Sequence, residues 1–275
     1  MARYEELGFS LHRLTPRRDY ALHTHDYSEL EIILSGSAIN SINGKSFPIR
    51  TGDVFVVGKG ATHEITQIDG LELYNIGFNQ SALRGIGQDL LEMPGFHALF
   101  LQDSVSDPNI RRLHLPSDQM QHVCRLLEEM EQEYQACMSG FQTSLLCNFA
   151  LLLLLLSRSH TQDLPVGGTW QAAAAAAKME RDYPNPISMQ DLAQSVYLSE
   201  RHFRRQFEKA YGLSPSEYLL NLRLNAACRL LLCEDLTVTH TAMACGFSDG
   251  NYFSRMFHRK YGMSPTAYRR LHNPG

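Results

Sequence analysis

Short apolar stretches separated by turn residues dominate the chain between residues 20 and 80. Glu29–Leu34 and Val54–Val57 are rich in aliphatic residues, and Leu71–Phe78 repeats the pattern. Asn43-Gly44 lies between two such stretches, and both residues tolerate the positive φ of a tight hairpin turn. Several strands separated by Gly, Asn and Asp predict a β-sandwich or barrel.

Helical spacing replaces this pattern after Pro116. A first helix is expected to begin at Ser117 as its N-cap, and a second is expected over about 141–157. The Leu151–Leu156 run of the second helix is apolar on all sides, so it must be buried. Internal packing and a subunit interface both remain open. We favour the interface, because a small barrel offers little surface to cover such a helix.

The C-terminal part of the chain is helical in pattern and repeats itself after about 50 residues. Phe203–Tyr218 matches Phe253–Tyr268, and each copy follows a short helix and a tight turn. Ser199 and Ser248 are expected to cap the second helix of each unit. These are the parts of a helix-turn-helix, expected over about 188–210 and 237–260.

One face of each second helix carries aromatic residues at positions i, i+4 and i+8, and the opposite face is polar. Arg suits guanine edges and phosphate, Asn suits adenine, and Ser adapts to either. The polar face therefore predicts contacts with double-stranded DNA. In the first unit the expected DNA-binding residues are Arg201, His202, Arg204, Arg205 and Lys209, and in the second they are Asn251, Ser254 and Arg255.

The net charge of −4 conceals an asymmetry that agrees with this interpretation. From Thr169 to the end there are 13 Lys/Arg and 9 Asp/Glu, against 12 and 20 before it. A basic C-terminal part behind an acidic body is typical of a polyanion-binding module carried by a different domain. Six cysteines without a Cys-x-x-Cys pair exclude a zinc module of that type and suggest reduced thiols.

Residues from about 170 to 271 resemble the DNA-binding domain of the AraC/XylS family of bacterial transcription regulators. The segments that carry the resemblance are Gly246-Phe-Ser-Asp, Tyr252-Phe-Ser-Arg-Met-Phe, Tyr261-Gly-Met-Ser-Pro and Tyr268-Arg. The resemblance implies a seven-helix, bipartite DNA reader. By position, it places base contacts on Arg201, Arg204, Arg205, Asn251, Ser254 and Arg255. It also implies a contact of Asp249 with RNA polymerase.

In the N-terminal part, His23-x-His25-x3-Glu29 resembles the first cupin motif, and the segment that ends at His63 resembles the second. These four residues are expected to contact a small-molecule effector. If the protein holds a metal ion, the same four would bind it. Three readings stay open: a ligand sensor, a metal-binding cupin domain with sensing or enzymatic activity, and a constitutive regulator whose barrel is only a dimerisation scaffold. We favour the sensor, without catalysis or cofactor.

The segments around His23–Glu29, Pro94–Phe100 and Arg112–Leu115 look most like the rhamnose-regulator branch of the family, which implies a sugar as the effector. The sequence thus predicts a multidomain α+β protein. Its expected parts are a cupin-like effector barrel (1–110), a helical dimerisation region (111–159), a linker (160–168) and an AraC-type DNA-binding domain (169–275). We expect a cytoplasmic homodimer that binds DNA, effector and RNA polymerase, with no secretory signal and no membrane span.

Overall fold

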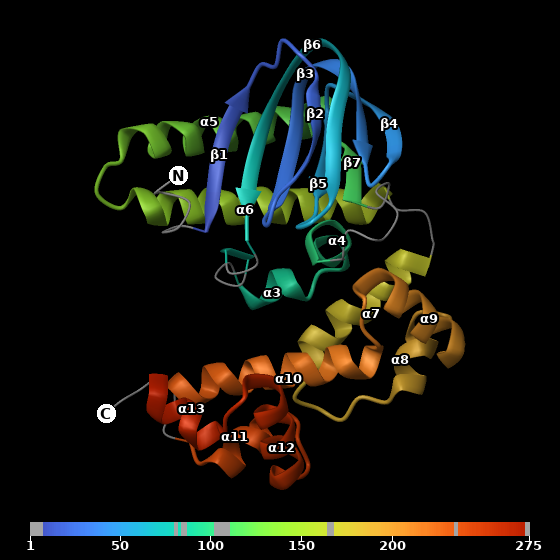
Figure 1. Ribbon diagram of the computed structural model, residues 1–275, viewed down its shortest axis with the longest axis vertical. Coiled ribbons are helices and arrows are strands. Elements are labelled where there is room, and N and C mark those ends of the chain that lie inside the picture. Colours follow the sequence, from blue (N-terminus) through green and yellow to red (C-terminus); the bar gives the residue numbers. More distant parts are fainter. Residues whose placement is uncertain are drawn as a thin grey trace.

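The computed structural model of the protein describes residues 8–79, 82–83, 87–101, 111–163, 168–233 and 236–272. In these residues a curled sheet and a helical hairpin form an N-terminal domain, and the C-terminal domain is helical (Figure 1). Two short helices, α3 (Gln88–Leu91) and α4 (Pro94–Phe96), lie between the sheet and the C-terminal domain. The predicted fold class is confirmed.

Seven strands of the described residues form one antiparallel sheet in the order β1-β6-β3-β5-β7, with β2 paired to β6 and β4 to β3. Their bounds are β1 Phe9–Leu14, β2 Tyr20–Thr24, β3 Ser28–Ile42, β4 Lys45–Arg50, β5 Asp53–Val57, β6 Thr62–Phe78 and β7 Arg112–His114. The Asn43-Gly44 turn is confirmed, since both residues have positive φ. β7 extends the sheet beyond residue 110, where the sequence placed the end of the barrel.

β3 and β6 are longer than the sequence pattern predicted, and they bend together. Their register shifts between Ile33 and Ile39. In this bend Gly36 has a φ of 80°, and a Cβ there would clash with the backbone of Gly70. The bend curls the sheet, so that its inner face encloses a small core.

Successive side chains along a strand point to opposite faces, and this divides the apolar residues between two cores. Leu30 and Ile32 pack in the core shared with the helical hairpin. Ile33 packs in the smaller core inside the curled sheet. By the same alternation, Glu29 and Glu31 share the inner face with Ile33.

The helical hairpin consists of α5 (Ser117–Ala136) and α6 (Phe141–Asp163), which run across the sheet (Figure 1). Ser117 is not the N-cap: Pro116 occupies that position without a side-chain bond, and α5 starts one residue early. Phe141–His160 in α6 is apolar and long enough to cross a membrane. Its Leu152, Leu153 and Leu156 are fully buried within the chain and belong to the core shared with the sheet.

This packing corrects the view of the Leu151–Leu156 run as a surface that the barrel cannot cover. α6 contacts α4, α5 and β7, so the chain itself covers the face of α6 that carries Leu152, Leu153 and Leu156. Leu151 and Leu146 remain exposed, at 52% and 38%. α6 also continues through residues 160–163 of the expected linker, because His160 is buried with the core face of the helix, and α7 begins at Gly168. Residues 164–167 lie outside the described part of the chain.

The C-terminal domain has two helix-turn-helix units joined by one long helix (Figure 1). Its helices are α7 Gly168–Asp182, α8 Met189–Ser195, α9 Glu200–Tyr211, α10 Pro215–Cys233, α11 Val238–Ala244, α12 Gly250–Tyr261 and α13 Pro265–His272. The alanines of α7 pack in the first core of this domain. The second core gathers around Phe253 and Phe257.

Candidate nucleic-acid interface and ligand pocket

The first unit consists of α8 and α9. The Ser199 side chain accepts a hydrogen bond from the His202 amide and caps α9, as predicted. Phe203 and Phe207 are buried on the face of α9 that packs on α7 and α8. Gly212 ends the helix with a φ of 68°. Local capping and the aromatic face therefore fix which side of α9 meets solvent.

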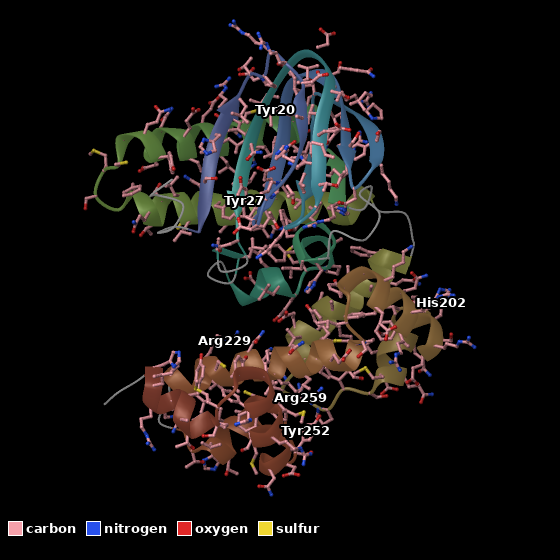
Figure 2. All side chains as sticks on the ribbon, viewed as in Figure 1. Tyr20, Tyr27, His202, Arg229, Tyr252 and Arg259 are labelled. Atoms are coloured by element: carbon pink, nitrogen blue, oxygen red, sulfur yellow. The ribbon has the colours of Figure 1, made fainter. Side chains whose placement is uncertain are left out.

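That solvent face carries every DNA-binding residue that the sequence predicted for α9, the recognition helix of the first unit, which we call the first reading helix. The exposed residues are Arg201, His202, Arg204, Arg205 and Lys209. Figure 2 shows His202 at the outer edge of the domain. Arg204 forms an ion pair with Glu208 at 2.8 Å, so it must exchange that partner to reach a base. Arg205 has no ion pair with any described residue and is the freer arginine.

The second unit consists of α11 and α12, and its cap differs from the prediction. Asp249, not Ser248, caps α12: its Oδ1 accepts the Asn251 amide at 2.8 Å. Asn251 and Arg255 are exposed and Ser254 is half-buried. The negative charge of Asp249 also stabilises α12, because it lies at the positive end of the helix dipole.

Several basic residues of this domain hold the fold together, a role that the charge count did not reveal. Arg223 of α10 donates to the backbone oxygens of Tyr183 and Asn185. Lys260 of α12 donates to Asn221 and Asn225 of α10. The Arg223 bonds tie α10 to the segment between α7 and α8, and the Lys260 bonds fix the second unit on α10. The sequence pattern could not predict these hydrogen bonds, because each acceptor lies far from its donor along the chain.

The curled sheet encloses a pocket of about 230 Å³. It is lined by Ser10, His12, Leu14, Tyr20, His23, Tyr27, Glu29, Glu31, His63, Ile65, Leu73 and Asn75. Three of the four predicted effector residues line it, and the fourth, His25, contacts Glu29 and His63. A larger hollow of about 620 Å³ lies beside α5. The pocket of the curled sheet is the better ligand site, because the buried side chains of Glu29, Glu31 and His63 bring polar groups together in its wall.

His25, Glu29 and His63 form a compact cluster. Glu29 Oε2 lies 3.0 Å from His25 Nε2 and 3.3 Å from His63 Nε2, and the two nitrogens are 3.2 Å apart. Burial disfavours the Glu29 carboxylate, but the hydrogen bond and charge of His25 outweigh it and lower the pKa of Glu29. Burial lowers the pKa of His63 to about 4. His63 is therefore neutral at pH 7.

The sequence reasoning missed Glu31, Asn75 and the two pocket tyrosines. Glu31 is fully buried, and burial raises its pKa to about 8. Its Oε1 accepts from the Asn75 amide at 3.3 Å. The alternation of side chains along a strand could have predicted Glu31 as a pocket residue, because it lies two residues after Glu29 on the same face. Asn75 comes from β6, which the hydrophobic pattern cannot pair with β3.

One buried contact links the two domains. His97 lies in the π-helix η1 (His97–Leu101), and its Nε2 lies 2.6 Å from the Leu91 oxygen. Its Nδ1 lies 3.3 Å from the hydroxyl of Tyr211, the last residue of α9. α7 also packs against α3, α4 and η1. The first reading helix thus touches the ligand-binding domain directly.

Comparisons with known proteins match both domains. A model of the AraC-like ligand binding domain matches residues 6–134, and a helix-turn-helix domain model matches residues 192–271. The transcriptional activator RhaR of Pectobacterium carotovorum is 32% identical over 93% of this chain and 88% of its own length. The chain belongs to the AraC family. It is a DNA-binding transcription regulator with a ligand-binding domain, and the predicted resemblance is confirmed.

Two further proteins illustrate the range of this likeness. The transcriptional activator RhaS of Escherichia coli O1:K1 is 29% identical over 86% of this chain and 83% of its own. An AraC-type regulator structure from Chromobacterium violaceum is 33% identical, covers 40% of this chain and all of its own, and has a TM-score of 0.36.

Proposed function

We propose that this regulator activates sugar-utilisation genes in response to a small molecule bound in its N-terminal pocket. The observation that carries the proposal is the buried contact between His97 and Tyr211, which joins the ligand-binding domain to a reading helix. A ligand that favours one arrangement of the domains shifts the population presented to DNA. The relatives RhaR and RhaS are named as transcriptional activators, which supports activation rather than repression of the target genes. The resemblance to the rhamnose-regulator branch supports a sugar as the effector.

The two reading helices lie in successive major grooves on one face of the duplex. Support comes from α10, which connects the two units: Arg223 bonds the backbone of Tyr183 and Asn185 ahead of α8, and Lys260 bonds α12 to α10. Recognition helices reach base edges with their exposed polar side chains. Arg205 and Arg255 read bases, and Lys209 contacts phosphate. Arg255 lies over the Tyr252 ring at 5.6 Å, which restricts its orientation.

A sugar suits the pocket because its hydroxyl groups find both donors and acceptors there. Glu29 is a carboxylate acceptor, whereas Glu31 at pH 7 is largely a protonated donor. The flat ring of Tyr20 and the apolar side chain of Leu73 line the pocket, and the face of a sugar ring can pack against them. A thermal-shift screen of the full chain against neutral sugars and aromatic acids tests this class. Stabilisation by aromatic acids alone would contradict the sugar proposal.

The chain acts as a cytoplasmic homodimer, with α6 at the subunit contact and Asp249 touching RNA polymerase. Leu146 and Leu151 are exposed on α6 and would lie in this subunit contact. Exposure of Asp249 beside the DNA face supports the polymerase contact. Two subunits would then present four reading helices to two half-sites.

The DNA assignment predicts different behaviour for arginine and lysine variants. Arg205→Ala or Arg255→Ala removes a base contact, so binding to the correct site should weaken by about 1–3 kcal/mol while non-specific binding changes little. Lys209→Ala should weaken binding to all sequences alike and reduce its salt dependence. Fluorescence anisotropy with specific and scrambled duplexes at several salt concentrations measures both. Equal losses in all three variants would refute the division of roles.

A further inference from the structure

The pocket of the curled sheet holds two carboxyl groups close together. Glu29 and Glu31 lie on the same face of β3, line the pocket, and are 6% and 2% exposed. One oxygen of each carboxyl group and one nitrogen of His63 lie within 4.8 Å of one another. Two carboxylates at this distance in a buried site repel each other. A positive charge placed between them would remove this repulsion.

The chain itself supplies an ion-pair partner to only one of these two acids. Glu29 Oε2 lies 3.0 Å from His25 Nε2. Glu31 accepts one hydrogen bond on Oε1, from the Asn75 amide, and its buried Oε2 has no hydrogen-bond partner among the described residues. The described residues that line the pocket include no lysine and no arginine. Glu31 therefore presents an unused acceptor to whatever fills the pocket.

A protonated amine has the donors and the charge that this pair of acids lacks. An ammonium nitrogen forms hydrogen bonds of about 2.7–2.9 Å to carboxylate oxygens, so one nitrogen can join two oxygens up to about 5.6 Å apart. The oxygens of Glu29 and Glu31 lie within this limit. Tyr20 and Tyr27 also line the pocket, and the face of an aromatic ring attracts a cation. A hydroxyl group has a single proton to donate and brings no charge.

We propose that the pocket selects a sugar that carries a protonated amine, with the ammonium group bound between Glu29 and Glu31. This ligand class rests on the proposed sugar-sensing function and narrows it to amino sugars. The cavity of about 230 Å³ is smaller than the sites of drug-sized ligands, which agrees with a single sugar ring. In the empty pocket burial keeps Glu31 largely protonated at pH 7, and an ammonium group beside it favours the carboxylate form.

Calorimetric titration of the full chain at pH 7, in a buffer with a chelator, tests this class with matched pairs of sugars. Glucosamine, galactosamine and mannosamine each carry an amine where glucose, galactose and mannose carry a hydroxyl group. At least one amino sugar should bind about 10–100-fold more tightly than its neutral partner, because hydrogen bonds to charged groups are stronger. In Glu31→Gln this preference should disappear, since the amide keeps the shape of the side chain and removes the charge. Glu64→Gln, on the opposite face of β6 between His63 and Ile65, is the matched control and should keep the preference.

The proposal is overturned if the neutral sugars bind as tightly as the amino sugars, and the sugar-sensing function then stands without it. It is also overturned if none of these sugars binds, or if folded Glu31→Gln keeps the preference for the amine. Cyclohexylamine, a ring with an ammonium group and no hydroxyl groups, separates the two proposals. If it binds as tightly as the amino sugars, the amine site is supported and the sugar class is contradicted. The comparison of sugars on the parent protein needs no variant, so it decides the matter even if Glu31→Gln does not fold.

Discussion

Asp249 has two roles to separate, a helix cap and a surface charge. Its Oδ1 accepts the Asn251 amide, and the residue is exposed at the start of α12. Asp249→Asn keeps an acceptor at the cap and removes the charge, whereas Asp249→Ala removes both. Loss of a cap costs about 1 kcal/mol. We expect Asp249→Ala alone to lower the melting temperature, and both variants to lower transcription in a reconstituted polymerase assay while binding DNA normally.

An effect of Asp249→Ala on transcription that Asp249→Asn does not share would assign the residue to the cap alone. Arg255, two turns further along the exposed face, gives the contrasting phenotype, because its loss should reduce DNA binding itself.

Gly246 is required by the turn of the second unit. It has a φ of 84°, and a Cβ there would lie 2.6 Å from the Tyr183 oxygen and 2.9 Å from the Pro184 oxygen. Gly262 has a φ of 73° with open space around it. Gly262→Ala should therefore cost about 1–2 kcal/mol for the left-handed backbone alone. Gly246→Ala should cost clearly more, and thermal unfolding of both variants measures the difference. Equal losses of stability in the two variants would mean that the backbone near Tyr183 moves to make room for the added Cβ.

At the scale of elements, the helices of the C-terminal domain could be predicted from the sequence because the features that define them are local. Aromatic spacing, the Ser199 cap and Gly212 each act within one turn. The cap of α12 was misplaced by one residue, since Ser248 and Asp249 are both good caps and only packing chooses between them. Long-range features were not readable. The bend at Gly36 depends on β6, and the short helices α3, α4 and η1 have no periodicity of their own.

The candidate sites follow the same division. His23, His25, Glu29 and His63 have motif spacing and were found, whereas Asn75 reaches the pocket only through the pairing of β3 with β6. The exposed face of α9 was found because α9 is amphipathic. Structural roles of Arg223 and Lys260 depend on remote acceptors and were missed.

α6 offers a direct test of the dimer. Leu153 is fully buried in the chain, whereas Leu151 is 52% exposed. Leu153→Glu should unfold the domain, because an unpaired carboxylate in a core is costly. Leu151→Glu should leave each chain folded and dissociate the dimer, and sedimentation at several concentrations measures this. Thr143→Glu, exposed on the same helix without an apolar side chain, is the control. An unchanged dimer in Leu151→Glu would place the contact elsewhere.

At the scale of the whole molecule, the two domains meet at a buried histidine, and this makes their contact depend on pH. Burial lowers the pKa of His97 from 6.5 to about 4, and the hydrogen bonds to Leu91 and Tyr211 suit the neutral ring. Between these two pKa values the unfolded chain binds a proton that the folded chain does not. Stability therefore falls as the pH drops from about 6.5 towards 4.

At pH 5 this single group should remove about 2 kcal/mol of the stability present above pH 7. His97→Gln does not titrate, so it should be less stable than the parent at pH 7.5, through lost packing, and the difference should shrink by pH 5. Chemical unfolding at both pH values measures it, with His122→Gln as the exposed control. Other buried groups, such as Glu31 and His63, titrate in both proteins and cancel in the comparison. A difference that stays constant with pH would show that His97 accepts a proton within the closed interface, and that the link between pocket and reading helix tolerates a charge.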